Sequence, residues 1–248
     1  MFFSVITVTY NAEKTLERTI RSVVGQGYPR VEYIIIDGNS TDGTGKIIEK
    51  YADRIASFVC EPDNGLYEAM NKGLSKASGD YVWFLNAGDT FYAPDTLEIL
   101  ASKLDPDSLP DILYGETAIV DDSGNFKYMR RLKVPEKLTR KSFRKGMLVC
   151  HQAFIVKKSI APEYDLHYRF SGDFDWCIRC MEKATNIFNS RQILVNYLEE
   201  GLTTENHRLS LKERYRIMKT HYDKIPVFLW HLWFAARFLV AKFFRNRK

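Results

Sequence analysis

The feature that most constrains the fold is a regular alternation of strand and helix patterns through the first hundred residues. Short apolar or β-branched runs read as strands: "FSVITVTY", "VEYIIID", "ASFVCE" and "YVWFLN". Helical patterns lie between them, over residues 12–26, 38–55 and 65–77. Strands separated by helices of this length imply right-handed βαβ crossovers and a mainly parallel, buried central sheet flanked by helices. We therefore expect an α/β fold.

Polar residues follow each of these predicted strands: Thr9 to Asn11, Asp37, Glu61 to Asn64, and Asn86 to Asp89. In parallel sheets, ligands bind at the carboxyl ends of the strands. Asn, Asp and Gly also dominate ordinary turns, so any one of these ends has a bland alternative explanation. Four such ends together favour a site for a ligand with hydroxyl, imide or phosphate groups.

The charge of the chain is unevenly distributed. The 248 residues suffice for one large α/β domain or for a domain with a tail. Residues 126–146 hold nine Lys or Arg against one Glu, and residues 208–248 hold eleven against two acids. Such basic segments indicate an anionic partner, which is a membrane surface, a phosphate-bearing substrate or nucleic acid.

The four cysteines give no disulfide or metal pattern. Cys177 and Cys180 have redox or half-zinc spacing, but no second pair completes a tetrahedral site, so we interpret them as packing thiols in a helix. The start of the chain, "MFFSVITVTYN", lacks the charged region and long apolar run of a signal peptide. We expect a cytoplasmic location.

Two long stretches carry a family resemblance: "SVITVTYNAEKTLERTIRSVVGQGYPRVEYIIIDGNSTDGT" and "EPDNGLYEAMNKGLSKASGDYVWFLNAGD". They resemble the family 2 glycosyltransferases of the GT-A fold, of the bacterial surface-polysaccharide type. The match covers Phe2 to about Leu100 and resumes at "HQAFIV" and "SGDFDWCIR". The resemblance implies a GT-A domain over residues 1–207, with a nucleotide-binding half (1–100) and an acceptor-binding half (101–207). No GxGxxG or GxxxxGK[ST] loop occurs.

The resemblance places several residues beside a nucleotide-sugar donor: Thr9, Asn11, Asp37, Gly65, Asn71 and Lys72. Asp37 would accept a hydrogen bond from the base, usually the imide N–H of uracil, and a carboxylate suits that donor. Lys72 has a second interpretation as a surface ion pair, because Glu68 lies one helical turn before it.

Asp89 falls where the family's DxD region closes. The family has acids at the positions of Asn86 and Gly88, so here Asp89 is the acid that survives and Asn86 is a neutral ligand. The resemblance implies a divalent cation, Mg²⁺ or Mn²⁺, held by Asp89 together with donor diphosphate oxygens. A helix N-cap is the alternative, but the next helix is expected near Pro94, too far along the chain.

An inverting transfer needs a base to take the acceptor hydroxyl's proton. The family uses the Asp of an "ED" pair that opens a helix, which corresponds here to Asp173, with Gly172 in place of the Glu. Asp175 is the other candidate, and we favour Asp173 because only one of the two can face the sugar. Helix capping by Ser171 or Asp173 is the alternative role.

Three further residues are weaker candidates. The resemblance places His151 and Gln152 near the donor sugar or acceptor, although a lone His there is as readily structural. Arg208, next to His207, lies in a polar stretch expected to be a loop that closes over the diphosphate, since Arg binds phosphate in a bidentate manner.

The last segment, residues 208–248, is expected to be a basic, aromatic-rich helical tail. Within Ile225 to Phe244 it is strongly apolar, and the charged positions from His231 to Lys248, apart from Arg247, fall within an arc of about 140° on a helix. Mid-span cations argue against a transmembrane helix and favour an interfacial one. The alternative is a helix docked on the protein's own core.

These observations predict a glycosyltransferase at the cytoplasmic face of a membrane, acting on a glycan or lipid-linked acceptor in polysaccharide biosynthesis. The family resemblance makes nucleic acid an unexpected partner. Two alternatives stay open. A sugar nucleotidyltransferase would need a glycine-rich basic loop after the first strand, which "TVTYNAEKTL" lacks. A non-catalytic nucleotide or sugar-binding partner is compatible with the reduced set of acids.

Overall fold

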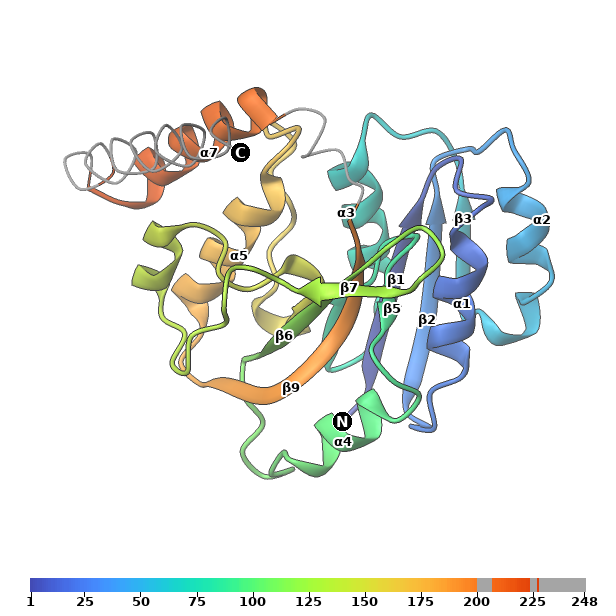
Figure 1. The fold of residues 1–248 in the computed structure, drawn as a ribbon, viewed down its shortest axis with the longest axis horizontal. Helices are drawn as coiled ribbons and strands as arrows, with labels where there is room; N and C mark the ends of the chain where they lie inside the picture. The colour runs from blue at the N-terminus through green and yellow to red at the C-terminus, as the bar shows by residue number, and fades with distance from the viewer. Residues whose placement is uncertain (200–206, 224–226, 228–248) are drawn as a thin grey trace, which may run out of the picture.

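The structure is a computed structural model that describes residues 1–199, 207–223 and 227 (Figure 1). Its first half alternates strands and helices as the sequence predicts. The strands are β1 Phe3–Thr9, β2 Val31–Asp37, β3 Ser57–Cys60 and β4 Tyr81–Phe84. The helical segments between them are α1 Leu16–Val24, α2 Thr44–Glu49, η1 Ala52–Arg54 and α3 Leu66–Lys76.

The second half is richer in strands and short helical turns. Its strands are β5 Thr90–Phe91, β6 Ile112–Val120, β7 Phe126–Met129, β8 Phe154–Lys157 and β9 Ile187–Leu198. Its α-helices are α4 Thr96–Ser102, α5 Gly172–Lys183 and α7 His207–His221. Three 3₁₀ turns complete it: η2 Arg140–Lys145, η3 His151–Ala153 and η4 Lys158–Ile160.

The described strands form one sheet in the order β3-β2-β1-β4-β8-β6-β9-β5, with β7 paired to β6. The prediction of a parallel sheet is confirmed for β3-β2-β1-β4. Beyond β4 the sheet is mixed: β8 pairs antiparallel to both β4 and β6, whereas β9 runs parallel to β6. The sheet curls along the long strand β9 (Figure 1).

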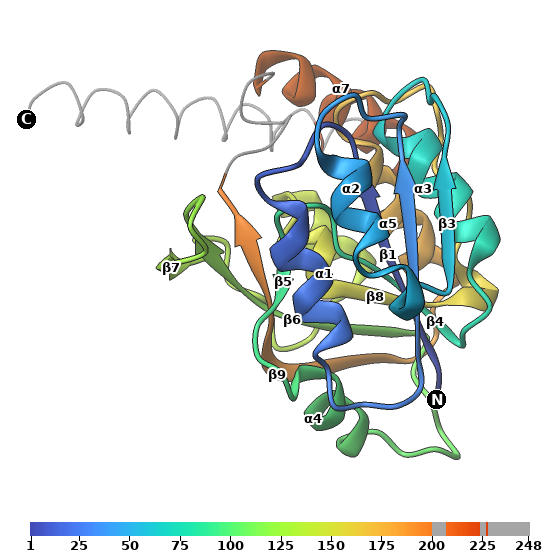
Figure 2. The same ribbon diagram turned by 90° about the vertical axis from the view of Figure 1, so that its right-hand side faces the viewer.

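Helices cover both faces of the parallel strands. Helices α1 and α2 lie on one side and α3 on the other, as right-handed crossovers require (Figure 2). Helix α3 approaches closely at Gly73, where a Cβ would lie 2.4 Å from the Ile6 side chain. The core between these layers contains fully buried aromatic rings, among them Phe3, Trp83 and Trp176.

Helices α5 and α7 pack together at the end of the molecule away from α1 and α2 (Figure 1). Ile217 and Met218 of α7 are buried, and the Tyr222 ring after the helix lies under the guanidinium groups of Arg140 (5.0 Å) and Arg144 (5.1 Å). Residues 207–223, expected at the start of a separate tail, therefore pack onto the domain.

The rest of the predicted tail lies outside the described residues. Of the segment Ile225 to Phe244 the structure describes Val227, which is buried. Within the described part of the chain, every helix is too short or too polar to cross a bilayer. Cys177 and Cys180 lie in the core as free thiols, which confirms the interpretation as packing residues.

Candidate active site

The carboxyl ends of the four parallel strands lie side by side at one edge of the sheet. Thr9 of β1 stands opposite Asp37 of β2, and Asp37 stands opposite Cys60 of β3. The chain beyond β4 continues along β1, because the backbone N–H of Ala87 donates to the carbonyl of Val8 (3.2 Å). The polar residues predicted at the strand ends are thus brought together.

Asn11 and Asp37 hold the loop that follows β2. The buried carboxylate of Asp37 accepts hydrogen bonds from the backbone N–H (3.0 Å) and the hydroxyl of Ser40 and from the thiol of Cys60 (3.2 Å). Asn11, at a positive φ of 47°, accepts the N–H of Thr41 (2.9 Å). A carboxylate offers about four acceptor positions, so Asp37 retains capacity for one more donor while it orders this loop.

Lys72 on α3 is held by its neighbours. Its ammonium group lies 3.1 Å from Glu61 and 3.6 Å from Glu68, and it donates to the carbonyl of Pro62 (2.9 Å). The predicted pair with Glu68 is therefore present and is extended by Glu61. A diphosphate would compete with two carboxylates for Lys72. Gly65, where α3 begins, adopts a φ of 135° that favours glycine.

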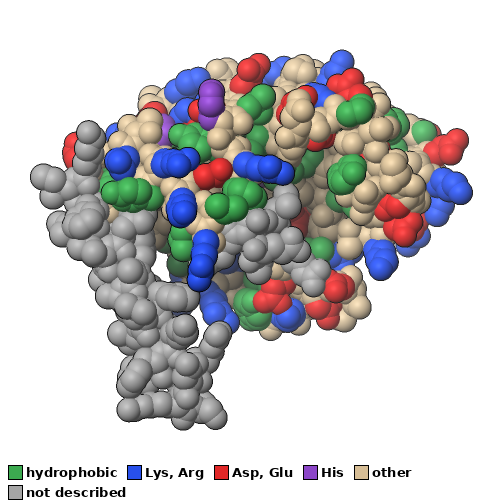
Figure 3. All heavy atoms as spheres, turned by 90° about the horizontal axis from the view of Figure 1, so that it is seen from above, with side chains coloured by type: hydrophobic (Ala, Val, Ile, Leu, Met, Phe, Trp, Pro, Cys, Tyr) green, Lys and Arg blue, Asp and Glu red, His purple; other side chains and the backbone are tan. Residues whose placement is uncertain are grey.

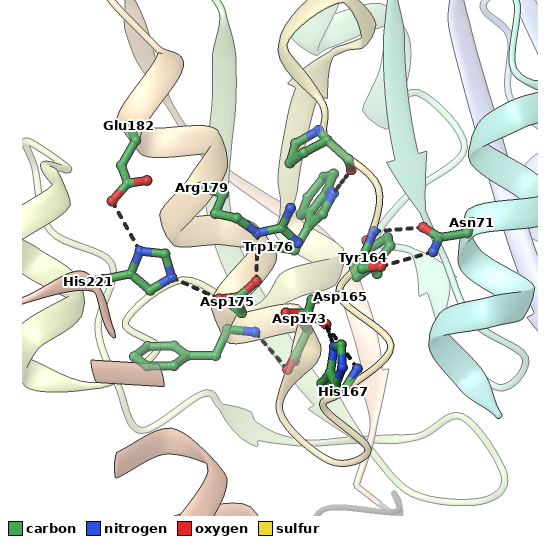
Figure 4. Close-up of polar contacts among 12 residues, drawn as sticks. Asn71, Tyr164, Asp165, His167, Asp173, Asp175, Trp176, Arg179, Glu182 and His221 are labelled. Atoms are coloured by element: carbon green, nitrogen blue, oxygen red, sulfur yellow. Dashed lines mark hydrogen bonds and ion pairs between the residues drawn. The ribbon is translucent and has the colours of Figure 1, made fainter. Parts of the chain in front are cut away.

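Asn71 ties α3 to the second half of the chain. Its amide donates to the backbone carbonyl of Tyr164 (3.0 Å) and accepts the N–H of the same residue (2.7 Å), as Figure 4 shows. The Tyr164 ring stacks on Trp176 of α5 with ring centroids 5.0 Å apart. Asn71 thus positions the loop before α5, and both ends of its amide are occupied.

Asp89 lies in the turn after β4 and is buried. It accepts a hydrogen bond from the backbone N–H of Leu198 in β9 (2.9 Å). Burial raises the pKa of Asp89 to about 7, against the opposing effects of hydrogen bonds from Leu198 and Gln152 and of the Arg18 charge. Helix α4 begins at Thr96, so Asp89 does not cap it.

The neighbourhood of Asp89 fits a divalent cation that is shared with a phosphate ligand. Within the described residues, the side-chain oxygens Asn86 Oδ1 and Thr9 Oγ1 are buried and have no hydrogen-bond partner. The described part of the chain contains no group of three or more His, Cys, Asp or Glu side chains arranged to hold a metal. Mg²⁺ commonly takes one or two carboxylates and completes its shell with substrate phosphates and water.

Gly88 explains why this turn departs from the family pattern. Its φ is 102°, a conformation that side chains rarely adopt, and a Cβ would lie 2.8 Å from the Leu198 side chain. The carbonyl of Gly88 also accepts a hydrogen bond from Arg18 (3.0 Å). An acid at position 88 would not fit this backbone.

Asp173 lies in the first turn of α5 and is partly exposed. Its Oδ1 accepts the backbone N–H of Phe174 (2.8 Å) and the hydroxyl of Tyr67 on α3 (3.4 Å). Within the described chain no donor reaches its Oδ2. Ser171 precedes the helix but makes no side-chain cap bond. Of the capping role predicted as the alternative, only the hydrogen bond that the Phe174 N–H donates to Asp173 is present.

Asp175 points to the opposite side of the helix, between α5 and α7 (Figure 4). Its two oxygens contact Arg179 (2.6 Å) and His221 (2.8 Å), and His221 also contacts Glu182 (3.1 Å). Burial opposes protonation of His221, but its hydrogen bonds to Asp175 and Glu182 outweigh that effect and raise its pKa. Asp175 therefore anchors α7 and does not face the strand ends.

His151 and Gln152 are buried in η3. The Nε2 of His151 lies 2.7 Å from the hydroxyl of Tyr164, and burial lowers the pKa of His151 to about 4. The side chain of Gln152 bonds to Asp89 and accepts from the thiol of Cys150 (3.0 Å). Gln152 thus lies beside Asp89. His151 packs among aromatic rings, as expected for the structural role that was its alternative interpretation.

The prediction of a loop around Arg208 is wrong in part. Arg208 lies in the first turn of α7, a helix, with its side chain exposed. The residues just before it, 200–206, are outside the described part of the chain. His207 opens the same helix, and its side chain is not described.

Asp89 and Asp173 share one electrostatic environment although they belong to different halves of the chain. The negative charge of each contributes to raising the pKa of the Cys150 thiol and of the Tyr197 hydroxyl, and in both cases burial is the larger cause. Both carboxylates therefore lie within electrostatic range of Cys150 and of Tyr197 in β9. A carboxylate with a free oxygen can act as a general base, and a carboxylate beside other oxygen ligands can hold a divalent cation.

Comparison with known proteins shows the family and the fold of this chain. The family described as "Glycosyl transferase family 2" matches residues 4–164. The chain belongs to this family. It is a glycosyltransferase by family, and its fold is GT-A, with the mixed, curled sheet described above.

Curated relatives and solved structures match this chain over most of its length. A "PGL/p-HBAD biosynthesis glycosyltransferase" of Mycobacterium tuberculosis is 30% identical over 207 residues, 80% of this chain and 77% of the relative. The "Putative teichuronic acid biosynthesis glycosyltransferase TuaG" of Bacillus subtilis is 29% identical over 198 residues, 78% and 77% of the two chains. Staphylococcus aureus TarS, solved with UDP-GlcNAc, has a TM-score of 0.73 and 22% identity. That match covers 89% of this chain and 65% of the solved TarS chain, which is the fragment 1–349.

The sequence analysis missed several residues around the candidate active site. Tyr67 contacts the candidate base, Tyr197 lies near both carboxylates, and Glu213 of α7 binds the loop before α5. Tyr67 stands inside the stretch that carries the family resemblance, so its position was a usable signal. No pattern in the sequence points to Tyr197 or Glu213.

Proposed function

We propose that this glycosyltransferase transfers a sugar from a UDP-linked donor to an acceptor hydroxyl with inversion at the anomeric carbon. The observation that carries the proposal is the partly exposed Asp173 carboxylate, whose Oδ1 is held by Phe174 and Tyr67 and whose Oδ2 is reached by no donor among the described residues. The complexes of TarS with UDP-GlcNAc and with UDP support a uridine nucleotide as the donor's carrier.

Asp173 would act as the base. Its Oδ1 is held by Phe174 and Tyr67, and Oδ2 is left to accept the proton of the attacking hydroxyl. In an inverting reaction the hydroxyl oxygen attacks the anomeric carbon as the bond to the diphosphate oxygen breaks. The proton passes to Asp173, and the nucleotide diphosphate leaves.

Asp89 and Asn86 would hold a Mg²⁺ or Mn²⁺ ion together with the donor's diphosphate. When bound, such an ion stabilises the negative charge that develops on the departing diphosphate. A mannosyltransferase of Pyrobaculum calidifontis was solved with GDP-Man and Mn²⁺, with a TM-score of 0.58 to this chain at 18% identity, which supports a cation at this position. Asp37 would accept the uracil imide, with Thr9, Asn11, Gly65 and Asn71 shaping the nucleotide side.

The acceptor is proposed to be a lipid-linked glycan in the biosynthesis of a surface polysaccharide, at the cytoplasmic face of the membrane. The teichuronic acid assignment of TuaG supports such a pathway. One exposed side of α7 carries cations at helical spacing: Arg208, Lys212, Arg216 and Lys219. Figure 3, which looks onto the face with α7, shows Lys and Arg gathered there beside hydrophobic side chains. Such a surface suits anionic lipid headgroups.

Replacement of Asp173 by Asn tests the proposal. We expect transfer to fall by ~10²- to 10⁴-fold, the usual contribution of a general base, while UDP still binds in isothermal titration. Asp165→Asn, on the loop before α5, is the matched control because that carboxylate contacts exposed His167 only. Unchanged turnover in Asp173→Asn would reject the base. Binding of UDP without transfer by the wild-type protein, across a panel of nucleotide sugars and acceptors, would favour a binding-only role.

A further inference from the structure

The backbone that leads into the base is held by side chains from two distant parts of the chain. Residues 169–173 form the last turn of a loop and the first residues of α5. Helix N-termini leave backbone N–H groups without partners inside the helix, and a local Ser, Thr, Asp or Asn normally satisfies one of them. Here Ser171 makes no such bond.

Glu213 of α7 binds three backbone N–H groups in the loop just before this helix. Its carboxylate accepts the backbone N–H of Arg169 (2.9 Å), Phe170 (2.8 Å) and Ser171 (2.9 Å). Successive N–H groups that converge on one point form an anion-binding concavity, and a carboxylate in it makes charge-assisted hydrogen bonds. Three such bonds from one residue fix the path of the chain two residues before Asp173.

A second contact from α7 strengthens this attachment. The hydroxyl groups of Ser210 and Ser171 lie 2.9 Å apart, and both residues are buried. Because Ser171 cannot turn its hydroxyl both to α7 and to its own helix, the pairing with Ser210 explains why the local cap is missing.

Tyr67 of α3 holds the next two residues from the other side. Its hydroxyl donates to Asp173 Oδ1 (3.4 Å) and lies close to the backbone N–H groups of Gly172 and Asp173. Glu213 also contributes to raising the pKa of Tyr67, after burial and the charge of Asp173, so the two holding groups lie near one another. Glu213 therefore binds the backbone N–H groups from Arg169 to Ser171, and Tyr67 binds the Asp173 carboxylate.

We propose that Glu213 is a positioning residue for the base, acting through the loop 169–171 to set where the Asp173 carboxylate lies. Glu213 itself contacts neither Asp173 nor the strand ends. The inference rests on the transfer reaction proposed above and adds α7, predicted as part of a tail, to the machinery of that reaction.

The test compares Glu213→Ala and Glu213→Gln with wild-type protein in the full chain. Loss of the carboxylate frees the loop, and a misplacement of the base near 1 Å lowers the rate by ~10²-fold. We expect kcat for transfer to fall by that factor in Glu213→Ala and by less in Glu213→Gln, which keeps one acceptor oxygen. The KM for the donor and the affinity for UDP are expected to stay unchanged, because the strand ends are untouched.

Asp223→Asn is the matched control, since it removes an exposed acid just beyond α7 that makes no contact with the loop. It should leave kcat unchanged. Thermal unfolding and UDP titration of each variant identify a variant that has failed to fold. If Glu213→Ala fails to fold, wild type is compared with Glu213→Gln, which is the more conservative substitution.

Formate provides a readout that a general loss of stability would not produce. In Glu213→Ala the three N–H groups remain and offer a site for a small carboxylate, so added formate should raise kcat of this variant and leave wild type unaffected. Hydrogen exchange of the amides 169–171 should increase in the variant. A folded Glu213→Ala that keeps wild-type kcat, or a loss of kcat matched by the same loss of UDP binding, would overturn the inference. Absence of transfer by wild type would instead reject the proposed function.

Discussion

The two halves of the candidate active site are built in different ways. On the donor side, Thr9, Asp37 and Asn86 stand where parallel strands end, so their positions follow from the sheet itself. On the base side, Asp173 is positioned by Tyr67, 106 residues earlier, and through its loop by Glu213, some forty residues later. One half is fixed by local regularity, and the other by long-range side-chain contacts.

This difference predicts different responses to mutation. Single changes on the donor side should affect ligand binding while the sheet persists, because strand pairing supplies the geometry. Changes around the base should affect catalysis and local stability together, because side chains replace regular structure there. The following predictions test that contrast, beginning with the largest expected effect.

Asp89→Asn should abolish the response to Mn²⁺ and lower transfer by at least about 10²-fold, because a bound cation contributes several kcal/mol of charge stabilisation. The same change should stabilise the metal-free protein at pH 8. The folded pKa of about 7 lies above the unfolded value near 4, so the wild type loses stability as pH rises between them. The upper bound of this loss is on the order of 4 kcal/mol.

Thermal unfolding in chelator at pH 5 and pH 8, with transfer assays with and without Mn²⁺, checks both parts. Asp95→Asn, which removes an exposed acid from the start of α4, should change neither. If chelator does not change the transfer rate of the wild-type protein, the proposed cation at Asp89 is rejected.

Gly172→Ala should destabilise the fold by about 1–3 kcal/mol, since a Cβ would lie 2.8–3.0 Å from the Tyr67 ring. That ring cannot easily yield because it stacks on Tyr164 with centroids 5.6 Å apart. In a Tyr67→Ala background the same change should cost little, so urea unfolding of the four proteins should give a coupling energy of similar size. Gly45→Ala, with open space around its Cβ position, is the control. Additive effects would show that Tyr67 is not what excludes a side chain at 172.

His221→Gln should have the smallest effect, visible as a lost pH dependence. Because the folded pKa of His221 is raised, its charged contacts with Asp175 and Glu182 stabilise the fold below pH 6.5 and are lost as pH rises through the raised value. Solvent screening limits the effect to about 1 kcal/mol. Urea unfolding at pH 6 and pH 8.5 should show a decline for wild type that His221→Gln lacks. His167→Gln, whose ring is exposed, should keep the decline.

The parallel half of the fold was predictable because its signals are local. Apolar runs such as Tyr81 to Phe84 are short enough to be strands, and the spacing of Leu16, Ile20 and Val23 is helical, so each element could be read from its own residues. Strand β8, by contrast, pairs with β4 although residues 85–153 lie between them, and the mixed order β8-β6-β9 follows from no periodicity.

The candidate site shows the same limit. The sequence identified Asp37 and Asp89 as strand-end acids, but it could not show that Lys72 is held by Glu61 or that Gln152 bonds to Asp89. Those contacts join residues that are distant in the chain or separated by an irregular loop. Arg208 was misjudged because the polar residues around it also suit a helix whose outer face is solvated.

The contacts of Glu213 also have a consequence for how the molecule folds. The hydrogen bonds of Glu213 need both the loop before α5 and helix α7, which stand in the last third of the chain. The parallel strands and α3 can assemble from the first hundred residues, whereas the segment 169–173 is complete only when α7 has docked. A partly folded chain would therefore acquire the edge that receives the donor before it acquires a correctly placed base, and chemical competence would be the last property to appear during folding.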